Sequence, residues 1–215
     1  MKDEKDEGVI LVGGGGHALS LAEFASSGIK GYVANSSNEA MPGEWIGDDR
    51  KGLEMAREGE KFHVAFVYSG LPVMARRRRI IEEYEKAGAL FSSLISPTSI
   101  VTHNSVVGAG SAIMTGAIIN RARLGSHVIV NSGAIVEHDC EVGDNTFIGP
   151  GAIVGGFTKI GRNCFIGLGA KVGNGLTIAD DVTVAMGAVV NHDLTEPGIY
   201  HGTPLRRSKA RVRND

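Results

Sequence analysis

The chain has 215 residues, which is long enough for one large or two small domains with a hydrophobic core. Its formal net charge is −2 at pH 7, so it has no basic excess for a nucleic-acid backbone or a membrane surface, and we expect neither as a partner. The N-terminus is acidic, and the apolar run behind it is only a strand long, which predicts neither a signal peptide nor a membrane span. The two cysteines lack a short metal-binding spacing, which favours reduced thiols and a cytoplasmic location.

Residues 8–35 are typical of the opening of a βαβ unit, with an apolar strand, a glycine-rich turn, a helix and a second strand. The four consecutive glycines, 13–16, would let the backbone approach a phosphate closely at the start of the helix. The spacing of Gly13, Gly15 and Ala18 is close to the dinucleotide-binding fingerprint, which is a weak signal alone. A turn with only structural duties is the alternative interpretation.

Two features argue against NAD as the ligand of this unit. The second strand ends at Ala34 and Asn35, where the acidic residue that binds an NAD ribose would be expected. Residues 1–94 are also too few for both halves of a dinucleotide-binding fold. A mononucleotide or nucleotide-sugar site is therefore favoured.

A second strand and helix are expected further along the same unit. The pattern predicts a strand over 62–68, a turn at Ser69 and Gly70, and a helix ending near Lys86. Four arginines, 76–79, precede three glutamates in this helix. We expect them to form i,i+4 ion pairs on a solvated face.

The second half of the chain repeats with a period of six residues. An aliphatic side chain occupies every sixth position in the series Leu124, Val130, Val136, Val142, Ile148, Val154, Ile160, Ile166, Val172, Ile178, Val184 and Val190. An earlier series from Ile95 to Ile119 joins it after one five-residue step. This period predicts a parallel β-helix, in which each hexapeptide is one short strand and a corner. The aliphatic side chains should point inward, and the glycines that usually follow them should supply the positive φ of the corners. Cys140 and Cys164 occupy an inward small position, so we expect buried thiols and not nucleophiles.

Three segments carry a resemblance to a known family: VGGGGHA near the N-terminus, NSGAIVEHDCEVGD within the repeat and GTPLRR near the C-terminus. The repeat resembles the left-handed hexapeptide β-helix of bacterial acyltransferases, in which three hexapeptides make one coil. Together with the short βαβ unit, the chain is similar to the NeuD/PglD type of sugar acyltransferase. The resemblance implies an α/β nucleotide-sugar-binding domain over 1–94 and a left-handed parallel β-helix with a C-terminal tail over 95–215.

The resemblance also implies an activity. Members of this family transfer an acetyl group from acetyl-CoA to a sugar, commonly an amino sugar carried on a nucleotide. We therefore expect an N-acetyltransferase with acetyl-CoA as co-substrate. A solenoid with an exposed apolar face gains by packing around a threefold axis, so we expect a homotrimer, and the resemblance places the active site between two subunits. No metal is expected, because zinc enzymes of this fold class use closely spaced histidines and Gly133 and Gly143 stand at those positions.

The resemblance assigns roles to individual positions. His138 matches the catalytic base, and Asp139 matches its acidic neighbour. The substrate-binding positions match Gly15, Gly16, His17, Asn35, Ser69, Gly70 and Asn131. The coenzyme-binding positions match Phe147, Gly156, Leu168, Met186 and Arg206. Asn35 stands where the family often has an Asp-Asp pair, Phe147 replaces a coenzyme-contacting histidine, and Arg206 replaces a lysine while keeping its charge.

The chemistry of acyl transfer suits the His-Asp pair. An amine that attacks a thioester must lose a proton, so a base that titrates near neutral pH is needed within hydrogen-bond reach, and histidine is such a base. A carboxylate beside it could fix the imidazole tautomer or stabilise the imidazolium. His138 lies beside a corner and should be exposed. One coil further on, Gly156 has no side chain, which leaves a groove for an extended pantetheine arm. The alternative is that His138 is an ordinary surface residue.

Two other functions stay open at this point. One is O-acetylation of a sugar such as a sialic acid, since one base can serve an amine or a hydroxyl. The other is a scaffold or nucleotide-sugar sensor without turnover. The His-Asp pair favours chemistry over sensing.

Overall fold

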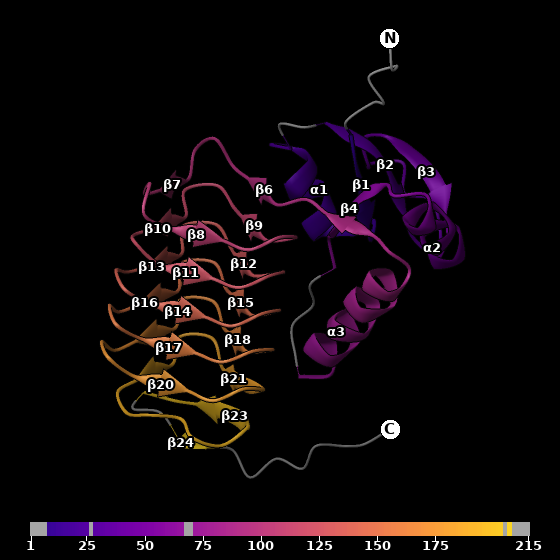
Figure 1. Cartoon of the computed structure of the whole chain (residues 1–215). Coiled ribbons are helices and arrows are strands. Elements are labelled where there is room, and N and C mark those ends of the chain that lie inside the picture. Colours follow the sequence, from indigo (N-terminus) through magenta and orange to yellow (C-terminus); the bar gives the residue numbers. More distant parts are fainter. Residues whose placement is uncertain (1–7, 26–27, 67–70, 204–205, 208–215) are drawn as a thin grey trace.

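The computed structural model describes residues 8–25, 28–66, 71–203 and 206–207. An N-terminal α/β unit lies against one side of a stack of short strands wound into a left-handed parallel β-helix (Figure 1). Both parts confirm the fold class predicted from the sequence. Within the described ranges, the helices are too short or too polar to cross a membrane.

The N-terminal unit is a five-stranded parallel sheet in the order β3-β2-β1-β4-β5 with three helices. Its elements are β1 (Val9–Val12), α1 (Gly16–Ala22), β2 (Ile29–Val33), β3 (Glu44–Gly47), α2 (Asp49–Arg57), β4 (Lys61–Val64), α3 (Leu71–Lys86) and β5 (Leu90–Phe91). The expected opening of strand, turn, helix and strand is present, and β4 ends earlier than the strand predicted over 62–68. The sequence does not predict β3 or α2.

The β-helix is built almost entirely from two-residue strands that form three sheets, which are parallel except for the antiparallel pair of the last two strands. Its strands are β6 (Leu94–Ile95), β7 (Ile100–Val101), β8 (Val106–Val107), β9 (Ala112–Ile113), β10 (Ile118–Ile119), β11 (Arg123–Leu124), β12 (Ile129–Val130), β13 (Ile135–Val136), β14 (Glu141–Val142), β15 (Phe147–Ile148), β16 (Ile153–Val154), β17 (Lys159–Ile160), β18 (Phe165–Ile166), β19 (Lys171–Val172), β20 (Thr177–Ile178), β21 (Val182–Val184), β22 (Val189–Val190), β23 (Gly198–His201) and β24 (Arg206–Arg207). The β12 sheet runs from β6 to β24, the β13 sheet from β7 to β22, and the β14 sheet from β8 to β20. Each expected aliphatic position is the last residue of a strand.

The strand register explains the single five-residue step in the repeat. Ile135 pairs with Ile153 one coil further on. Across the step, the partner of Ile135 in the preceding coil is Ile118, which is one residue closer in sequence. The sheet continues without a break because the missing residue is taken out of a corner and not out of a strand.

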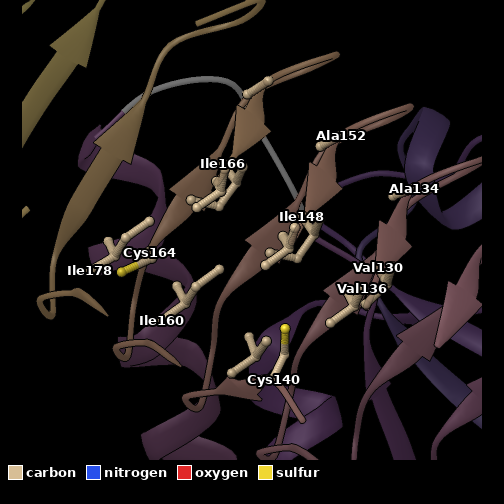
Figure 2. Packing of buried hydrophobic residues seen from close by; sticks show 14 of the residues in the cluster. Val130, Ala134, Val136, Cys140, Ile148, Ala152, Ile160, Cys164, Ile166 and Ile178 are labelled. Carbon is tan, nitrogen blue, oxygen red and sulfur yellow. The ribbon is translucent and has the colours of Figure 1, made fainter. Parts of the chain in front are cut away.

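The interior of the β-helix is packed as the repeat predicts. Figure 2 shows Ile148, Ile160 and Ile166 in one cluster with the small side chains of Ala152, Cys140 and Cys164. Cys140 and Cys164 are free thiols in this cluster and have no solvent exposure. Burial raises the pKa of Cys140 and raises that of Cys164 to about 12. The expected burial of both cysteines is therefore confirmed.

The glycines that follow the aliphatic positions are expected to supply a positive φ, and this expectation is wrong. Gly143 and Gly149 do not have a positive φ; the residues two positions later do, Asn145 with φ 53° and Gly151 with φ 64°. A Cβ atom on Gly143 would lie 2.7 Å from the backbone nitrogen of Arg162 on the next coil. Glycine is needed at this position because successive coils approach too closely for a side chain.

The N-terminal unit packs on the outer face of the β12 sheet. Ile129, Phe147 and Phe165, the first residues of their strands, form one buried cluster with Leu21 of α1 and Met74 of α3. This cluster joins the two units through apolar side chains.

The arginine run of α3 differs from expectation at one position. Arg77 is only 1% exposed and donates hydrogen bonds to the backbone carbonyl of His127 and to the side-chain oxygen of Asn145. The prediction of a solvated face is therefore wrong for Arg77. It holds for Arg78, which is half-exposed and lies 3.8 Å from Glu82 one turn later.

Candidate active site

His138 and Asp139 form a hydrogen-bonded pair at the corner between β13 and β14. The Nδ1 atom of His138 lies 3.0 Å from Oδ2 of Asp139, and the imidazole is 46% exposed. Asp139 has a φ of 59°, a left-handed conformation that aspartate tolerates better than most residues. Nη2 of Arg121, from the preceding coil, lies 3.2 Å from Oδ1 of the same carboxylate. Both carboxylate oxygens are therefore engaged.

The electrostatics of this pair favour one arrangement of the imidazole. The hydrogen bond from His138 and the charge of Arg121 lower the pKa of Asp139, so its carboxylate stays ionised near neutral pH. An ionised carboxylate accepts the Nδ1 proton, which leaves Nε2 of His138 without a proton and able to accept one. This arrangement suits a general base.

The backbone of the corner is also held by Glu137. Oε2 of Glu137 accepts hydrogen bonds from the backbone nitrogen of His138 at 3.3 Å and from Nδ2 of Asn120 at 3.0 Å. Asn120 belongs to the preceding coil, so the corner is tied to its neighbour in the stack. This support limits the movement of the histidine.

The imidazole of His138 lies directly against Gly156 because this residue has no side chain. A Cβ atom on Gly156 would lie 2.9 Å from both Cε1 and Nε2 of His138, closer than side chains pack. The ring of Phe157 meets the imidazole at an interplanar angle of 89°, with the ring centroids 5.0 Å apart. Any larger residue would displace the imidazole, which itself fills the space beside Gly156, so the groove expected there for a pantetheine arm stays a prediction.

A second candidate site is an open cleft of about 630 Å³ in the N-terminal unit. It is lined by Gly14, Gly15, Ala34, Asn35, Ser36, Ser37, Asn38 and Glu39. Two of the four consecutive glycines have a structural reason. Gly13 has a φ of 116°, which favours glycine, and a Cβ on Gly14 would lie 3.0 Å from the ring of Tyr32. A Cβ on Gly15 or Gly16 would have no neighbour within 4 Å. Gly15 lines the cleft, so its lack of a side chain keeps the cleft open, whereas Gly16 is not among the lining residues.

The other expected substrate-binding residues are dispersed. His17 does not line this cleft; it lies toward the interior, where burial and nearby Arg77 lower its pKa to about 4, and its Nε2 has no hydrogen-bond partner among the described residues. Ser69 and Gly70 lie outside the described residues. Asn131 is at the corner between β12 and β13, where its side chain accepts a hydrogen bond from the backbone of Ser132 at 2.7 Å.

The expected coenzyme-binding residues fall into different places. Leu168 and Met186 are 47% and 73% exposed at the corner between the β12 and β13 sheets, whereas Gly156 lies at the corner between the β13 and β14 sheets. Phe147 is only 4% exposed and stacks on Phe165, so the structure gives it no surface for a coenzyme. The backbone of Arg206 is in β24, and its side chain lies outside the description.

Sequence reasoning missed two residues that contact the His-Asp pair. Arg121 belongs to the coil before Asp139, and Phe157 stands 18 positions after it. The coil repeat is the signal that could have found them, since residues one coil apart lie side by side. No group of three or more histidines, cysteines or acidic residues is arranged to hold a metal ion in the part of the chain that the structure describes.

A hexapeptide β-helix with an exposed histidine held on a carboxylate at one corner is an acyltransferase type of fold and site. The family model for the bacterial transferase hexapeptide (six repeats) matches residues 121–156, and the model for the hexapeptide repeat of succinyl-transferase matches residues 157–192.

Solved structures are similar over nearly the whole chain. PerB from Caulobacter crescentus, in complex with CoA and GDP-perosamine, is 31% identical with a TM-score of 0.83, and the match covers 94% of this chain and 97% of that one. The acetyltransferase domain of PglB from Neisseria gonorrhoeae is 28% identical with a TM-score of 0.84, covering 94% of this chain and 100% of that one. Another structure of that domain contains acetyl coenzyme A. The chain therefore belongs to the sugar N-acetyltransferases of the left-handed β-helix type.

Proposed function

We propose that this protein transfers the acetyl group of acetyl-CoA to the amino group of a nucleotide-linked amino sugar, with His138 as the general base. The observation that carries the proposal is the exposed imidazole of His138, whose Nδ1 is fixed on Asp139, which leaves Nε2 as the nitrogen able to accept a proton. The similarity to PerB and to the PglB domain supports the choice of acetyl donor and the class of acceptor.

The proposed reaction uses the chain's residues as follows. Nε2 of His138 accepts a proton from the sugar amine as the amine forms a C–N bond with the thioester carbonyl carbon. The carboxylate of Asp139 stabilises the imidazolium that results. The C–S bond then breaks, and His138 returns the proton to the departing coenzyme A sulfur. The products are the N-acetylated sugar and coenzyme A with a free thiol, and the imidazole ends in its starting protonation state.

We propose that the two units of the chain bind different substrates. The cleft beside Gly15 and Asn35 binds the nucleotide, because it is open and partly lined by backbone and small polar groups. The β-helix binds the coenzyme along the corner at Gly156. This division retains the boundary expected near residue 94, and Leu94 begins the first strand of the β-helix sheets.

We also propose that the active protein is a homotrimer that packs through its β13 sheet. The outward residues of this sheet include a row of isoleucines, Ile100, Ile118, Ile135 and Ile153, of which the first and last are 57% and 38% exposed. Such an apolar row on one face favours closure around a threefold axis.

The position of the β13 sheet explains why the active site would be formed by two subunits. This sheet lies between the corner of His138 and the corner of Leu168 and Met186, which do not meet within one chain. When two copies pack through the β13 sheet, the corner that carries His138 in one copy meets the corner that carries Leu168 and Met186 in its neighbour. Ile153→Glu should therefore dissociate the protein and abolish activity, whereas Lys159→Glu on the β14 sheet should do neither. Sedimentation that shows a fully active wild-type monomer at micromolar concentration would contradict this arrangement.

The two free buried thiols support a cytoplasmic location, which we include in the proposal. The activity is tested by incubating the protein with acetyl-CoA and a panel of GDP-, dTDP- and UDP-linked amino sugars while following thiol release. The proposal expects a product heavier by one acetyl group that is stable to mild base, as an amide is. A base-labile product would indicate O-acetylation instead, and no thiol release with any member of the panel would contradict the proposal.

A further inference from the structure

Phe157 stands at a corner position that an aromatic residue rarely occupies. Its φ is 61°, in the left-handed region. Among the described residues, the other non-glycine residues in this region are Arg121, His127, Asp139, Asn145, Asn163 and Asp181. Asparagine and aspartate tolerate this conformation, but a bulky aromatic side chain is strained in it.

Burial does not account for the aromatic ring. Phe157 is 61% exposed, so the ring gains little from the core in return for the strained backbone. Within the described part of the chain, its aromatic contact is with the imidazole of His138, at 5.0 Å between centroids and nearly perpendicular. Strain of this kind is concentrated at functional sites, where the surrounding structure holds it in place.

The backbone places Phe157 firmly beside the histidine. The nitrogen of Phe157 donates a 2.9 Å hydrogen bond to the carbonyl oxygen of His138, so the two residues are fixed one coil apart. Gly156, directly before Phe157, lies against the imidazole, where a Cβ atom would come within 2.9 Å of Nε2. The imidazole is therefore bounded by Asp139, by the backbone of Gly156 and by the phenylalanine ring.

We propose that Phe157 is a positioning residue for the acyl transfer, which keeps the plane of the His138 imidazole fixed. The hydrogen bond to Asp139 anchors Nδ1 but permits the ring to rock about that contact. The perpendicular ring of Phe157 prevents this motion, so Nε2 keeps one direction relative to the corner. This inference rests on the proposed role of His138 as the base.

The central test is Phe157→Asn, because asparagine suits a left-handed corner and removes the ring. This variant should be at least as stable to heat as the wild type, since it relieves strain. Its kcat should fall by about 10- to 100-fold, the effect of a misaligned catalytic group. The KM for both substrates should stay within about twofold, since the ring acts on the base and not on binding. Phe157→Tyr, which keeps the ring, should retain wild-type kcat.

A spectroscopic measurement separates positioning from a general structural role. In ¹⁵N-edited NMR spectra of the histidine rings, assigned with His138→Ala, wild-type His138 should show one tautomer with a proton on Nδ1. Phe157→Asn should shift these signals toward an averaged mixture, while Phe157→Tyr should not. Sedimentation of all variants should show the same oligomeric state as the wild type.

The outcomes distinguish this inference from the proposed function. If His138→Ala keeps full activity, the proposed function fails, and this inference fails with it. If His138→Ala is inactive but Phe157→Asn has normal kcat and an unchanged tautomer, only the positioning role is overturned. A loss of trimer in Phe157→Asn would also overturn it, because the ring would then act as an interface residue.

Discussion

The guanidinium of Arg77 on α3 donates a 2.9 Å hydrogen bond to the backbone carbonyl of His127, which lies at a corner of the β-helix. The same group also donates to the side chain of Asn145, one coil further along that corner. Asn145 in turn donates from Nδ2 to the carbonyl oxygen of Met74 on α3 at 3.3 Å. These polar contacts fix α3 on the β-helix, and with it the orientation of the N-terminal unit.

Arg77→Ala should therefore destabilise the protein, whereas Arg78→Ala should not. Removing Arg77 leaves buried acceptors without a donor, at a cost of about 1–3 kcal/mol each. Arg78 is half-exposed, with ion-pair distances of 3.8 Å to Glu82 and Asp181, and such pairs contribute about 0–1 kcal/mol. Urea unfolding of the two variants measures the difference. Equal midpoints would contradict the role assigned to Arg77.

The hexapeptide period predicts the β-helix because every coil repeats the same local constraint. An inward aliphatic residue at each strand end is visible in the sequence at every turn of the solenoid. The buried cysteines follow from the same register. The left-handed residues, such as Asn145 and Asp139, are less visible, because several residue types share that position with glycine.

The features that the sequence does not reveal depend on tertiary packing. β3 is a short, mostly exposed edge strand, and α2 is a polar helix, so neither has a strong apolar pattern. Arg77 looks like its neighbours in the chain, and only the docking of α3 on the β-helix buries it. The contact between His138 and Asp139 requires the left-handed turn at Asp139, which spacing alone does not show.

A bulky side chain at Gly15 should block the nucleotide cleft without harming the fold. A Cβ there has no neighbour within 4 Å, so Gly15→Leu can be accommodated and its side chain projects into the cleft. The KM for the nucleotide sugar should rise by about tenfold or more, while the KM for acetyl-CoA stays unchanged. Steady-state kinetics with each substrate varied in turn measures both. Equal losses for the two substrates would contradict the two-site division.

Gly156→Ala should lower kcat by displacing the imidazole. The new methyl group would lie 2.9 Å from Nε2 of His138, so the ring must move out of its position. We expect a loss of about 100-fold in kcat, because small misplacements of a reacting group have effects of this size. Asn174→Ala, at the equivalent position one coil further on, is the matched control and should keep near-normal kcat. If both variants are fully active, the geometry at Gly156 is irrelevant to the reaction.

Asp139→Asn should reduce activity less than loss of the histidine. Asparagine also accepts the left-handed φ, so the backbone is preserved, but the neutral amide no longer stabilises the imidazolium. The kcat should fall by about 10- to 100-fold, as for other residues that orient a catalytic group. Asp181→Asn, a left-handed aspartate at a distant corner, should have no effect. An Asp139→Asn variant as slow as one without the imidazole would mean that the carboxylate has a more direct role.

The kcat of His138→Ala with a productive nucleotide amino sugar is the most direct test of the central claim. The account predicts a fall of about 10²- to 10⁴-fold, with both substrates still bound, because the imidazole acts mainly in the transition state. Isothermal titration of each substrate confirms binding, and the acid limb of the kcat/KM profile that reports the imidazole should disappear. A His138→Ala variant with near-normal kcat would contradict the account and reduce His138 to an ordinary corner residue.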